Sequence, residues 1–479
     1  MAAVGLLVTL AAATGIPATA AVDAQVTADE PQYLLTAGAL YERQDLDMGP
    51  DLRAETWRAY HRAQLPRQTA ELSGGQRLSP HDPLLPLLLA VPFGLGGWVG
   101  AKVAMAALAG VLAALLVWTS VVRFRVPLGA AVTVVAGFGV VPPLLAYGTQ
   151  IYPELPAALA VTAAIAAVTG PTNRRTAAVW VVAVAVLPWL AVKYAPVAVA
   201  IAGVGGCRLL SARNESWIAG GRATVERRLL GGAVTTLTVA AIGFVAFHQA
   251  VYGGWTVYAV GNHFGTGELS VMGESPDYAS RVQRLVGLLV DHDFGLLAWA
   301  PAFALAVPAV AALARRRPAG WFALALPLAA GWLNATFAAL TMHGWWWPGR
   351  QVVVVVPCLV LAVAWWLGTV ARWEAWRRPF LAATAFALLA WVWLLVEVQQ
   401  GTSTVVIDFA RTTNPLSRAW RLLLPDLRVL AAVDMARLGA WTVVIAVLAV
   451  RGWRHADPSG VAVRTGRARS AGAPAERPV

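Results

Sequence analysis

Two adjacent carboxylates, Asp29 and Glu30, lie in TADEPQYLLTAGAL, a few residues after an apolar run that is long enough to cross a bilayer. A third acid, Glu154, stands between two prolines in YPELP, where another apolar run begins. A carboxylate can act as a general base that takes a proton from a hydroxyl group. Ionisable residues at membrane depth are functional-site hypotheses by default. These three acids are therefore candidate catalytic residues.

Each of these acids also has a structural interpretation. Asp29 stands two residues before Pro31, which suits the first turn of a helix, so its side chain could cap that helix by accepting backbone N–H bonds. Glu154 could extend to the membrane surface and stay solvated there. A cap needs only one acid, however, and the sequence places two at this membrane exit. Both interpretations stay open at this stage.

Basic side chains supply groups that could bind an anion. Lysine occurs only twice in the chain, and Lys193 interrupts the apolar run LPWLAVKYAP beside Tyr194. Arg350 opens the apolar run in WWWPGRQVVVVVP. An ammonium and a guanidinium at such places could bind a phosphate, or they could anchor helix ends at the interface. The tryptophans before Arg350 are either an interfacial belt or a surface on which a sugar or lipid stacks.

Two histidines complete the candidate substrate-binding set, His81 in SPHDP and His263 in GNHFGTGELS. No two histidines stand three or four residues apart, as a pair of metal ligands on one helix would. We therefore predict no metal site; a divalent cation would suit phosphate chemistry, but no ligand spacing supports one. The sequence also contains no P-loop, dinucleotide fingerprint or nucleophile elbow. A transferase of this sequence would take its donor from a membrane lipid.

The elements that must position these residues are membrane helices. Of the 479 residues, 58% are hydrophobic and 13% are charged. A helix needs about 20 apolar residues to span the hydrocarbon layer, and about twelve segments approach that length. The predicted spans are 3–22, 99–121, 128–146, 150–169, 176–190, 193–206, 230–251, 293–314, 320–342, 350–369, 380–397 and 438–451. We predict an all-α polytopic membrane protein in which residues 1–451 form one module.

The distribution of charge predicts the orientation of these spans. Arginines gather in alternate loops, for example around Arg123 and Arg315, whereas most acids lie in the other loops. Because positive residues mark the cytoplasmic side, both termini are predicted to be cytoplasmic. The long loops on the outer side are 23–98, 252–292 and 398–436. The first of them is the predicted catalytic loop, and it contains a predicted juxtamembrane helix with one apolar face from Tyr33 through Leu40. Residues 452–479 are predicted to be a disordered basic tail.

Two apolar stretches have a second interpretation. Residues 84–98 are apolar, but prolines interrupt the run from residue 80 onward, so we favour an interfacial or re-entrant helix over a span. A span there would place Arg123 on the outer side, against the charge pattern. Residues 3–22 could be a cleaved signal peptide, but they lack a basic start and are longer than its usual apolar core.

The order of these motifs resembles the GT-C glycosyltransferase superfamily, in particular the branch of protein O-mannosyltransferases and lipid A aminoarabinose transferases. Asp29 matches the acidic motif of the first outer loop, whose Asp is the proposed base in that branch. Glu154 matches a second acid at the outer end of a later helix. Lys193 matches a lysine between two mid-chain helices, although its surroundings depart from the usual TKG. Arg350 resembles the basic residue that opens a late helix in PxRYxxPxxP segments.

The resemblance implies a chemistry as well as a fold. It implies transfer of a sugar, with inversion, from a polyprenyl-phosphate donor to a hydroxyl group of a lipid, glycan or protein. Asp29 would be the base with Glu30 beside it, and Lys193 and Arg350 would stabilise the leaving phosphate. His81 stands where many members have His-Pro-Pro, but here Asp82 takes the place of one proline. No basic stripe with interleaved aromatics is present, so no nucleic-acid partner is expected.

A transporter or flippase for a lipid-linked or anionic solute is the main alternative. The sequence shows no repeat of the first half of the predicted helices in the second half, and no G-x-x-x-D-[RK] loop. A non-catalytic lipid-binding scaffold would leave Asp29, Glu154 and Lys193 unexplained. We predict that these three side chains surround one outward-facing cavity. Scarce lysine beside abundant arginine and alanine is typical of GC-rich bacterial genomes, so the bacterial cytoplasmic membrane is the expected location.

Overall fold

The computed structural model describes the backbone of residues 1–66, 68–72, 74–218, 223–262, 264 and 266–456, and the side chains of these residues except those in 212–225. Throughout this described part the chain is largely helical, and its extended segments form isolated bridges instead of strands. The prediction of an all-α fold is confirmed.

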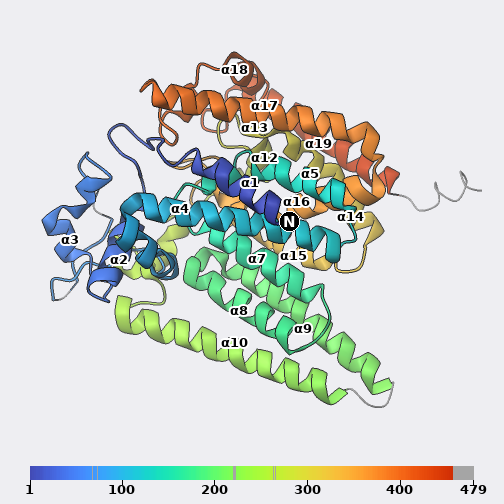
Figure 1. The fold of residues 1–479 in the computed structure, drawn as a ribbon, viewed down its shortest axis with the longest axis horizontal. Coiled ribbons are helices and arrows are strands. Elements are labelled where there is room, and N and C mark those ends of the chain that lie inside the picture. Colours follow the sequence, from blue (N-terminus) through green and yellow to red (C-terminus); the bar gives the residue numbers. More distant parts are fainter. Residues whose placement is uncertain (67, 73, 219–222, 263, 265, 457–479) are drawn as a thin grey trace, which may run out of the picture.

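The long helices run roughly in the same direction across the view in Figure 1, and α2 and α3 gather at one end. The first helices are α1 (Ala2–Ala13), α2 (Glu30–Glu42), α3 (Gly49–Ala54), α4 (Leu84–Val122), α5 (Leu128–Gly139), α6 (Leu144–Tyr147), α7 (Glu154–Val168), α8 (Arg174–Leu190), α9 (Ala195–Ile218) and α10 (Ala223–Tyr252). The later helices are α11 (Tyr278–Arg281), α12 (Arg284–Val290), α13 (Leu296–Trp299), α14 (Ala306–Arg316), α15 (Phe322–Leu333), α16 (Val356–Trp365), α17 (Trp373–Gln399), α18 (Pro415–Arg421) and α19 (Ala432–His455).

Short turns of 3₁₀ or π helix connect many of these helices. The 3₁₀ turns are η1 (Thr56–Ala59), η2 (Val192–Tyr194), η3 (Val257–Val260), η4 (Glu268–Met272), η5 (Pro301–Leu305), η7 (Arg350–Val355) and η9 (Phe409–Arg411). The π turns are η6 (Asn334–Ala338) and η8 (Trp366–Val370). Such turns tighten or interrupt the regular helix, and they mark functional hinges in many proteins.

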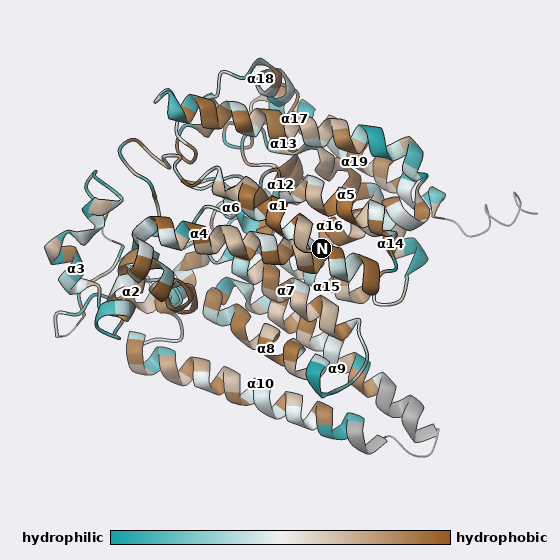
Figure 2. Cartoon of the chain, in the orientation of Figure 1, coloured by the Kyte–Doolittle hydropathy of each residue, from teal (hydrophilic) through white to brown (hydrophobic). Residues whose placement is uncertain are grey.

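Six helices in the described part are long and apolar enough to cross a membrane. They are Leu84–Val122, Val192–Ser211, Glu226–Val260, Arg350–Val370, Trp373–Gln399 and Ala432–His455. Hydrophobic residues cover the long helices, and hydrophilic residues gather at many of their ends (Figure 2). The chain is therefore an integral membrane protein. Helix length alone does not establish the predicted count of twelve spans.

Burial separates central helices from peripheral ones. The apolar window of Arg350–Val370 is 89% buried, whereas those of Glu226–Val260 and Ala432–His455 are only 6% buried. The segment that begins with Arg350 thus lies in the centre of the fold. The helices α10 and α19 leave their apolar side chains open to lipid, as expected for the outside of a membrane bundle.

Several predicted spans are shorter or more broken than the sequence suggested. The first helix ends at Ala13, ahead of Gly15 and Pro17, instead of continuing to residue 22. Segment 128–146 divides into α5 and α6, with two consecutive prolines at 142 and 143 between them. Segment 293–314 divides into α13, η5 and α14, and Pro301 opens η5. Proline lacks the N–H group that a continuous helix requires, which explains these breaks.

The predicted juxtamembrane helix exists as α2, but its surroundings differ from the prediction. The sequence suggested a helix with one apolar face, whereas every residue from Glu30 to Ala39 is buried. Close packing on the first part of α4 explains this: Gly38 lies against the ring of Phe93, and Gly94 lies against Tyr41. The helix that follows Asp29 is therefore an internal element of the bundle.

The α4 helix contains the break that separates residues 84–98 from the following span. Gly97 has φ 57° and ψ −151°, a backbone conformation outside the helical region. Beyond it, Gly100 leaves room for the carbonyl oxygen of Pro92, which a Cβ atom would approach to 2.1 Å. The first part of α4 therefore changes direction before the helix continues to Val122, in line with the prediction that residues 84–98 and 99–121 are distinct.

We predict that Gly97→Ala lowers the free energy of unfolding by about 1–3 kcal/mol, because its backbone conformation is essentially restricted to glycine. No atom lies within 4 Å of the added methyl group, so the cost would be conformational. Denaturant unfolding followed by tryptophan fluorescence would measure it. Gly96→Ala is the control, since Gly96 has no positive φ and equally open space. Equal stability of the two variants would contradict the prediction.

Candidate active site

Four charged side chains from distant parts of the sequence form one connected cluster. Arg350 Nη2 lies 2.7 Å from Asp29 Oδ2, and Arg350 Nε lies 2.9 Å from Glu154 Oε1. The same Glu154 oxygen also accepts a hydrogen bond from Lys193 Nζ at 2.7 Å. The structure thus brings together two predicted catalytic acids and two predicted phosphate-binding cations. Their formal charges cancel.

Each member of the cluster lies at the beginning of a helical element. Asp29 precedes α2, Glu154 is the first residue of α7, Lys193 lies in η2, and Arg350 is the first residue of η7. Side chains at such positions project beyond the end of the helix, while the hydrogen-bonded helix that follows fixes the position of their backbone. This arrangement lets four separate elements direct polar groups toward one point inside an apolar bundle.

The capping role predicted for the Asp29 side chain is wrong. Asp29 occupies the residue before α2, but its side chain makes no capping hydrogen bond and its backbone is already helical, with φ −83° and ψ −20°. An N-cap residue normally has an extended backbone that lets its side chain fold back onto the helix. The carboxylate points to Arg350 instead.

Aromatic rings enclose the guanidinium group of Arg350. Its Cζ atom lies 4.1 Å from the ring centre of Tyr152 and 4.8 Å from that of Trp346. Stacking on aromatic faces stabilises a partly desolvated arginine. Of the tryptophans at 345–347, Trp345 is exposed, whereas Trp347 is fully buried. The interpretation of these tryptophans as an interfacial belt therefore does not describe Trp346 and Trp347.

His81 lies on the other side of Asp29. Its Nε2 atom is 4.0 Å from Asp29 Oδ1 and 3.1 Å from the amide oxygen of Gln68. Its ring stacks on that of Tyr33, with 4.7 Å between the centres. Tyr33 and Gln68 could not be selected from the sequence, because neither is unusual in its local context. His81 borders the cluster without belonging to the chain of ion pairs.

Glu30 has a different environment from its neighbour. Its Oε1 accepts a hydrogen bond from the Ile151 amide at 2.8 Å, and its Oε2 accepts one from the Thr27 amide at 2.9 Å. Lys102, the other lysine of the chain, lies close enough to interact electrostatically and donates to the carbonyl of Gln25. Both oxygens of Glu30 thus hold backbone segments that flank the cluster, a contribution that the sequence did not indicate.

The surroundings shift the protonation of the two groups beside α2. Burial alone would raise the pKa of Asp29, but the neighbouring Arg350, with smaller effects of His81 and Lys193, lowers it to about 2. Burial lowers the pKa of His81 to about 4, against the opposing effect of Asp29. At neutral pH, Asp29 is therefore an anion and His81 is neutral. Burial raises the pKa of Glu30 above its ordinary value.

Several buried polar atoms around the cluster have no hydrogen-bond partner in the protein. They are the second carboxylate oxygen of Glu154, both amide atoms of Gln150, and the hydroxyls of Tyr152 and Tyr194. The Tyr194 ring centre lies 5.4 Å from Lys193 Nζ. Buried polar groups are nearly always paired, so such a concentration indicates a place for water or a polar ligand.

His263 lies outside the described residues. Within the described part, no three His, Cys, Asp or Glu side chains converge where they could hold a metal ion. The acids of the cluster are instead neutralised by Lys193 and Arg350.

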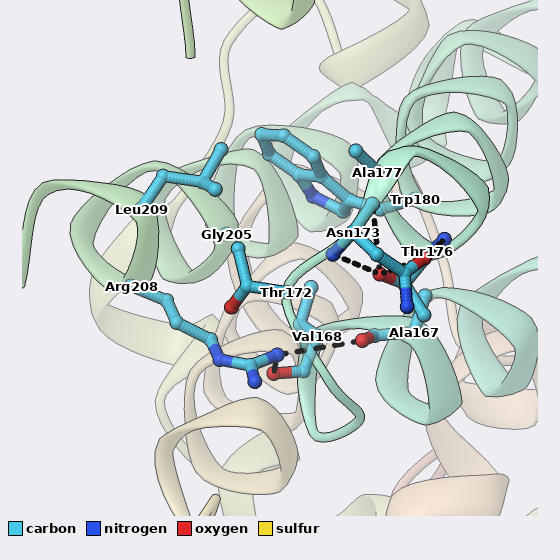
Figure 3. Close-up of a pocket in the computed structure, with 10 residues that line it drawn as sticks. All are labelled: Ala167, Val168, Thr172, Asn173, Thr176, Ala177, Trp180, Gly205, Arg208 and Leu209. Atoms are coloured by element: carbon cyan, nitrogen blue, oxygen red, sulfur yellow. Dashed lines mark hydrogen bonds between the residues drawn. The ribbon is translucent and has the colours of Figure 1, made fainter. Parts of the chain in front are cut away.

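A pocket at the other end of α7 has a structural explanation. It lies where the end of α7, the start of α8 and α9 meet, about 20 Å along the helix from Glu154 (Figure 3). Arg208 donates to the carbonyl oxygen of Val168, and Asn173 and Thr176 form a capping box at the start of α8. These polar groups are satisfied by helix ends, so we do not assign the candidate site here.

Comparison with known proteins identifies the fold. No protein-family model and no curated protein matches the chain. Among solved structures, the chain is similar to ArnT from Cupriavidus metallidurans bound to undecaprenyl phosphate, with a TM-score of 0.50 and 14% sequence identity over 95% of this chain and 75% of that chain. The chain has the GT-C fold. The apo structure of the same ArnT matches with a TM-score of 0.47 and 14% identity, over 90% of this chain and 72% of that chain. ArnT is an aminoarabinose transferase, so the fold agrees with the branch that the motifs resemble.

We predict that the Asp29 ion pair stabilises the protein in a pH-dependent way. Because the pKa falls from its ordinary 3.8 to about 2 on folding, ionised Asp29 contributes about 2 kcal/mol at neutral pH. This contribution is complete above the unfolded pKa and is lost as the pH falls from about 4 to about 2. The measurement is the free energy of unfolding of the wild type and Asp29→Asn at several pH values. Their difference should be constant from pH 7 to 5 and shrink below pH 4; a difference that already shrinks between pH 7 and 5 would contradict the assignment.

Proposed function

We propose that this protein is a membrane glycosyltransferase that moves a sugar from a polyprenyl-phosphate donor to an acceptor hydroxyl group. The observation that carries the proposal is the ion-paired cluster of buried Glu154 and Arg350 with half-buried Asp29 and Lys193, within a GT-C fold. The similar ArnT structure contains undecaprenyl phosphate, which supports a lipid phosphate as the donor's carrier. In this proposal the acceptor belongs to a lipid, a glycan or a protein, and the site faces the extracytoplasmic side.

The two cations of the cluster would bind the phosphate of the donor. In the structure, Lys193 and Arg350 both donate to Glu154 Oε1, so a phosphate competes with this carboxylate for them. Charge-assisted bonds from lysine and arginine to phosphate are strong, and the guanidinium can bind two oxygens at once. During transfer, negative charge develops on the departing phosphate, where the same cations stabilise it.

Asp29 would be the base in this reaction. The acceptor oxygen forms a bond to C1 of the sugar while the bond from C1 to the phosphate oxygen breaks, and the hydroxyl proton passes to Asp29. Attack opposite the leaving phosphate inverts the anomeric centre. With Arg350 bound, Asp29 has a pKa of about 2 and is a weak base. If Arg350 left Asp29 to bind the donor phosphate, the pKa of Asp29 would rise. Binding of the donor would therefore make Asp29 a stronger base.

The other predicted residues would orient the reactants. Glu154 has one oxygen without a protein partner, which could accept a hydrogen bond from the sugar or the acceptor. The Tyr194 hydroxyl is similarly unpaired. Neutral His81 lies beside Asp29 and can exchange hydrogen bonds with a hydroxyl group. Glu30 holds the backbone just before Asp29, at Thr27, and just before Tyr152, at Ile151, so we assign it a positioning role.

Incubation of the purified protein with a panel of polyprenyl-phosphate sugars would test the proposal. Release of free polyprenyl phosphate in the presence of an acceptor is the expected result. The same panel would identify the sugar, with mannose and arabinose as the first candidates. Transport of the intact lipid or solute across a vesicle membrane, without release of polyprenyl phosphate, would overturn the proposal in favour of a transporter.

Asp29→Asn should reduce kcat by about 10²–10⁴-fold, the range typical of a lost general base. Expression and donor affinity should stay unchanged, because the amide oxygen can still accept from Arg350. Single-turnover kinetics and equilibrium binding of the donor would separate the two effects. The exposed acid Glu42 on the same helix provides the control, and Glu42→Gln should retain wild-type kcat. Normal transfer by Asp29→Asn would exclude Asp29 as the base.

Arg350→Lys should weaken donor binding by about tenfold. Lysine keeps the positive charge but cannot span Asp29 and Glu154 as the guanidinium does. The dissociation constant of undecaprenyl phosphate would measure the effect. Arg421→Lys is a matched control, since Arg421 is also buried and bonded to a carboxylate, that of Asp293. Equal affinity of wild type and Arg350→Lys would remove Arg350 from the phosphate site.

A further inference from the structure

The helix that carries Lys193 is interrupted next to this residue. The α8 helix ends at Leu190, Ala191 is extended with φ −165° and ψ 133°, and η2 makes a single tight turn before α9 begins. This break lies between two apolar helices. Backbone groups exposed by such a break must find partners inside the protein, because lipid cannot supply them.

Two side chains from distant elements satisfy the backbone on either side of Lys193. The Val192 amide donates to Asp82 Oδ2 at 3.0 Å, and Asn334 Nδ2 donates to the Lys193 carbonyl oxygen at 3.1 Å. Asp82 thus fixes the residue before Lys193, and Asn334 fixes Lys193 itself. The direction of the lysine side chain depends on both contacts.

A histidine on α10 holds the other oxygen of Asp82. His248 Nε2 lies 3.2 Å from Asp82 Oδ1, and its Nδ1 lies 2.8 Å from the carbonyl oxygen of Phe244. His248 is completely buried, and the rings of Trp189, Phe244, Phe247 and Tyr252 surround it. The C-terminal end of α10 lies at the same end of the molecule as α2 (Figure 1).

The hydrogen-bond geometry defines where the protons of this pair lie. A carbonyl oxygen only accepts, so His248 Nδ1 carries a hydrogen that it donates to Phe244. One further proton must then lie between Nε2 and Asp82, either on the imidazole or on the carboxyl group. In both forms the pair has no net charge, and Asp82 Oδ2 remains an acceptor for the Val192 amide.

We propose that Asp82 and His248 are positioning residues for Lys193. By holding the Val192 amide, the pair fixes the interrupted helix in the position from which Lys193 reaches Glu154 and, on the proposed function, the donor phosphate. Asp82 also follows His81 directly, so it joins the two segments that border the cluster. Through His248, the peripheral helix α10 thus influences the position of Lys193, although it does not contact the ion-paired cluster.

The positioning role explains why this chain has Asp82 where the resembling family has the first proline of His-Pro-Pro. Proline at position 82 would have no side-chain oxygen to accept the hydrogen bond of the Val192 amide and no polar group to bond with His248. A buried histidine with two ring nitrogens requires two partners, and Asp82 supplies the second. The aspartate and the histidine therefore depend on each other, and each loses its partner when the other is replaced.

Substitutions of Asp82 distinguish positioning from charge. In Asp82→Asn, the amide oxygen can accept from Val192 while the NH₂ group donates to the neutral Nε2 of His248, so every bond is retained. In Asp82→Leu, the branched shape is kept with a larger side chain, but the Val192 amide and His248 Nε2 both lose their partner. Glu397→Leu is the matched control, because Glu397 is comparably buried and accepts from the Thr413 amide, with Trp393 and Thr413 as its neighbours.

The experiment measures binding of undecaprenyl phosphate to full-length protein in nanodiscs, together with hydrogen exchange of the Val192 and Lys193 amides. Asp82→Leu should weaken binding by about tenfold or more and accelerate exchange at Val192. Asp82→Asn should restore both, and Glu397→Leu should bind the lipid like the wild type. Wild-type hydrogen exchange in the other helices of Asp82→Leu would exclude general misfolding as the cause.

Two outcomes would contradict the positioning role of Asp82 and His248, and a third would contradict the proposed donor. Wild-type affinity and exchange in Asp82→Leu would overturn the positioning role, and so would an Asp82→Asn variant as defective as Asp82→Leu. Failure of the wild type to bind undecaprenyl phosphate would overturn the proposed donor instead. In that case, the exchange rate at Val192 in the two Asp82 variants would still decide whether the pair holds the helix break.

Discussion

The structure depends on a carboxylate that has no contact with solvent and shares one oxygen between two cations. Glu154 is completely buried, and its Oε1 binds both Lys193 and Arg350. Burial of charges costs several kcal/mol for each ion, and only close partners offset it. The four elements that contribute to the cluster must therefore meet within hydrogen-bonding distance. If one partner moved away, the others would remain as uncompensated charges in an apolar bundle.

This constraint explains why the helices around the site are irregular. The segments that carry Lys193 and Arg350 are 3₁₀ turns at the start of long apolar helices, and Gly349 before Arg350 adopts a left-handed conformation with φ 83°. A regular helix would direct its side chains radially along its length, toward lipid or toward neighbouring helices. Interruptions let the backbone turn the charged side chains inward, while Asp82 and Asn334 satisfy the backbone groups that the break exposes.

Much of the site could be predicted from the sequence because ionisable residues are rare within apolar runs. Glu154, Lys193 and Arg350 each interrupt or open such a run, and Asp29 follows one. The long-range partners could not be predicted in this way. His248 looks like one polar residue on an apolar helix, and its bond to Asp82 joins positions 166 residues apart, for which no local pattern exists. The Asp29 cap was the wrong inference for a related reason: local spacing favours a cap, but a distant arginine competes for the same carboxylate.

The charges at the site occur in balanced groups. Asp29, Glu154, Lys193 and Arg350 cancel, and the pair of Asp82 and His248 has no net charge. Such a site exerts little long-range electrostatic attraction, so it would not steer anions from solution over a Debye length. On the proposed function, the lipid-linked donor would need no such steering, because it would arrive by lateral diffusion within the bilayer. Its rate of encounter would be insensitive to ionic strength, and selectivity would arise only after contact, when the phosphate displaces a carboxylate from the cations.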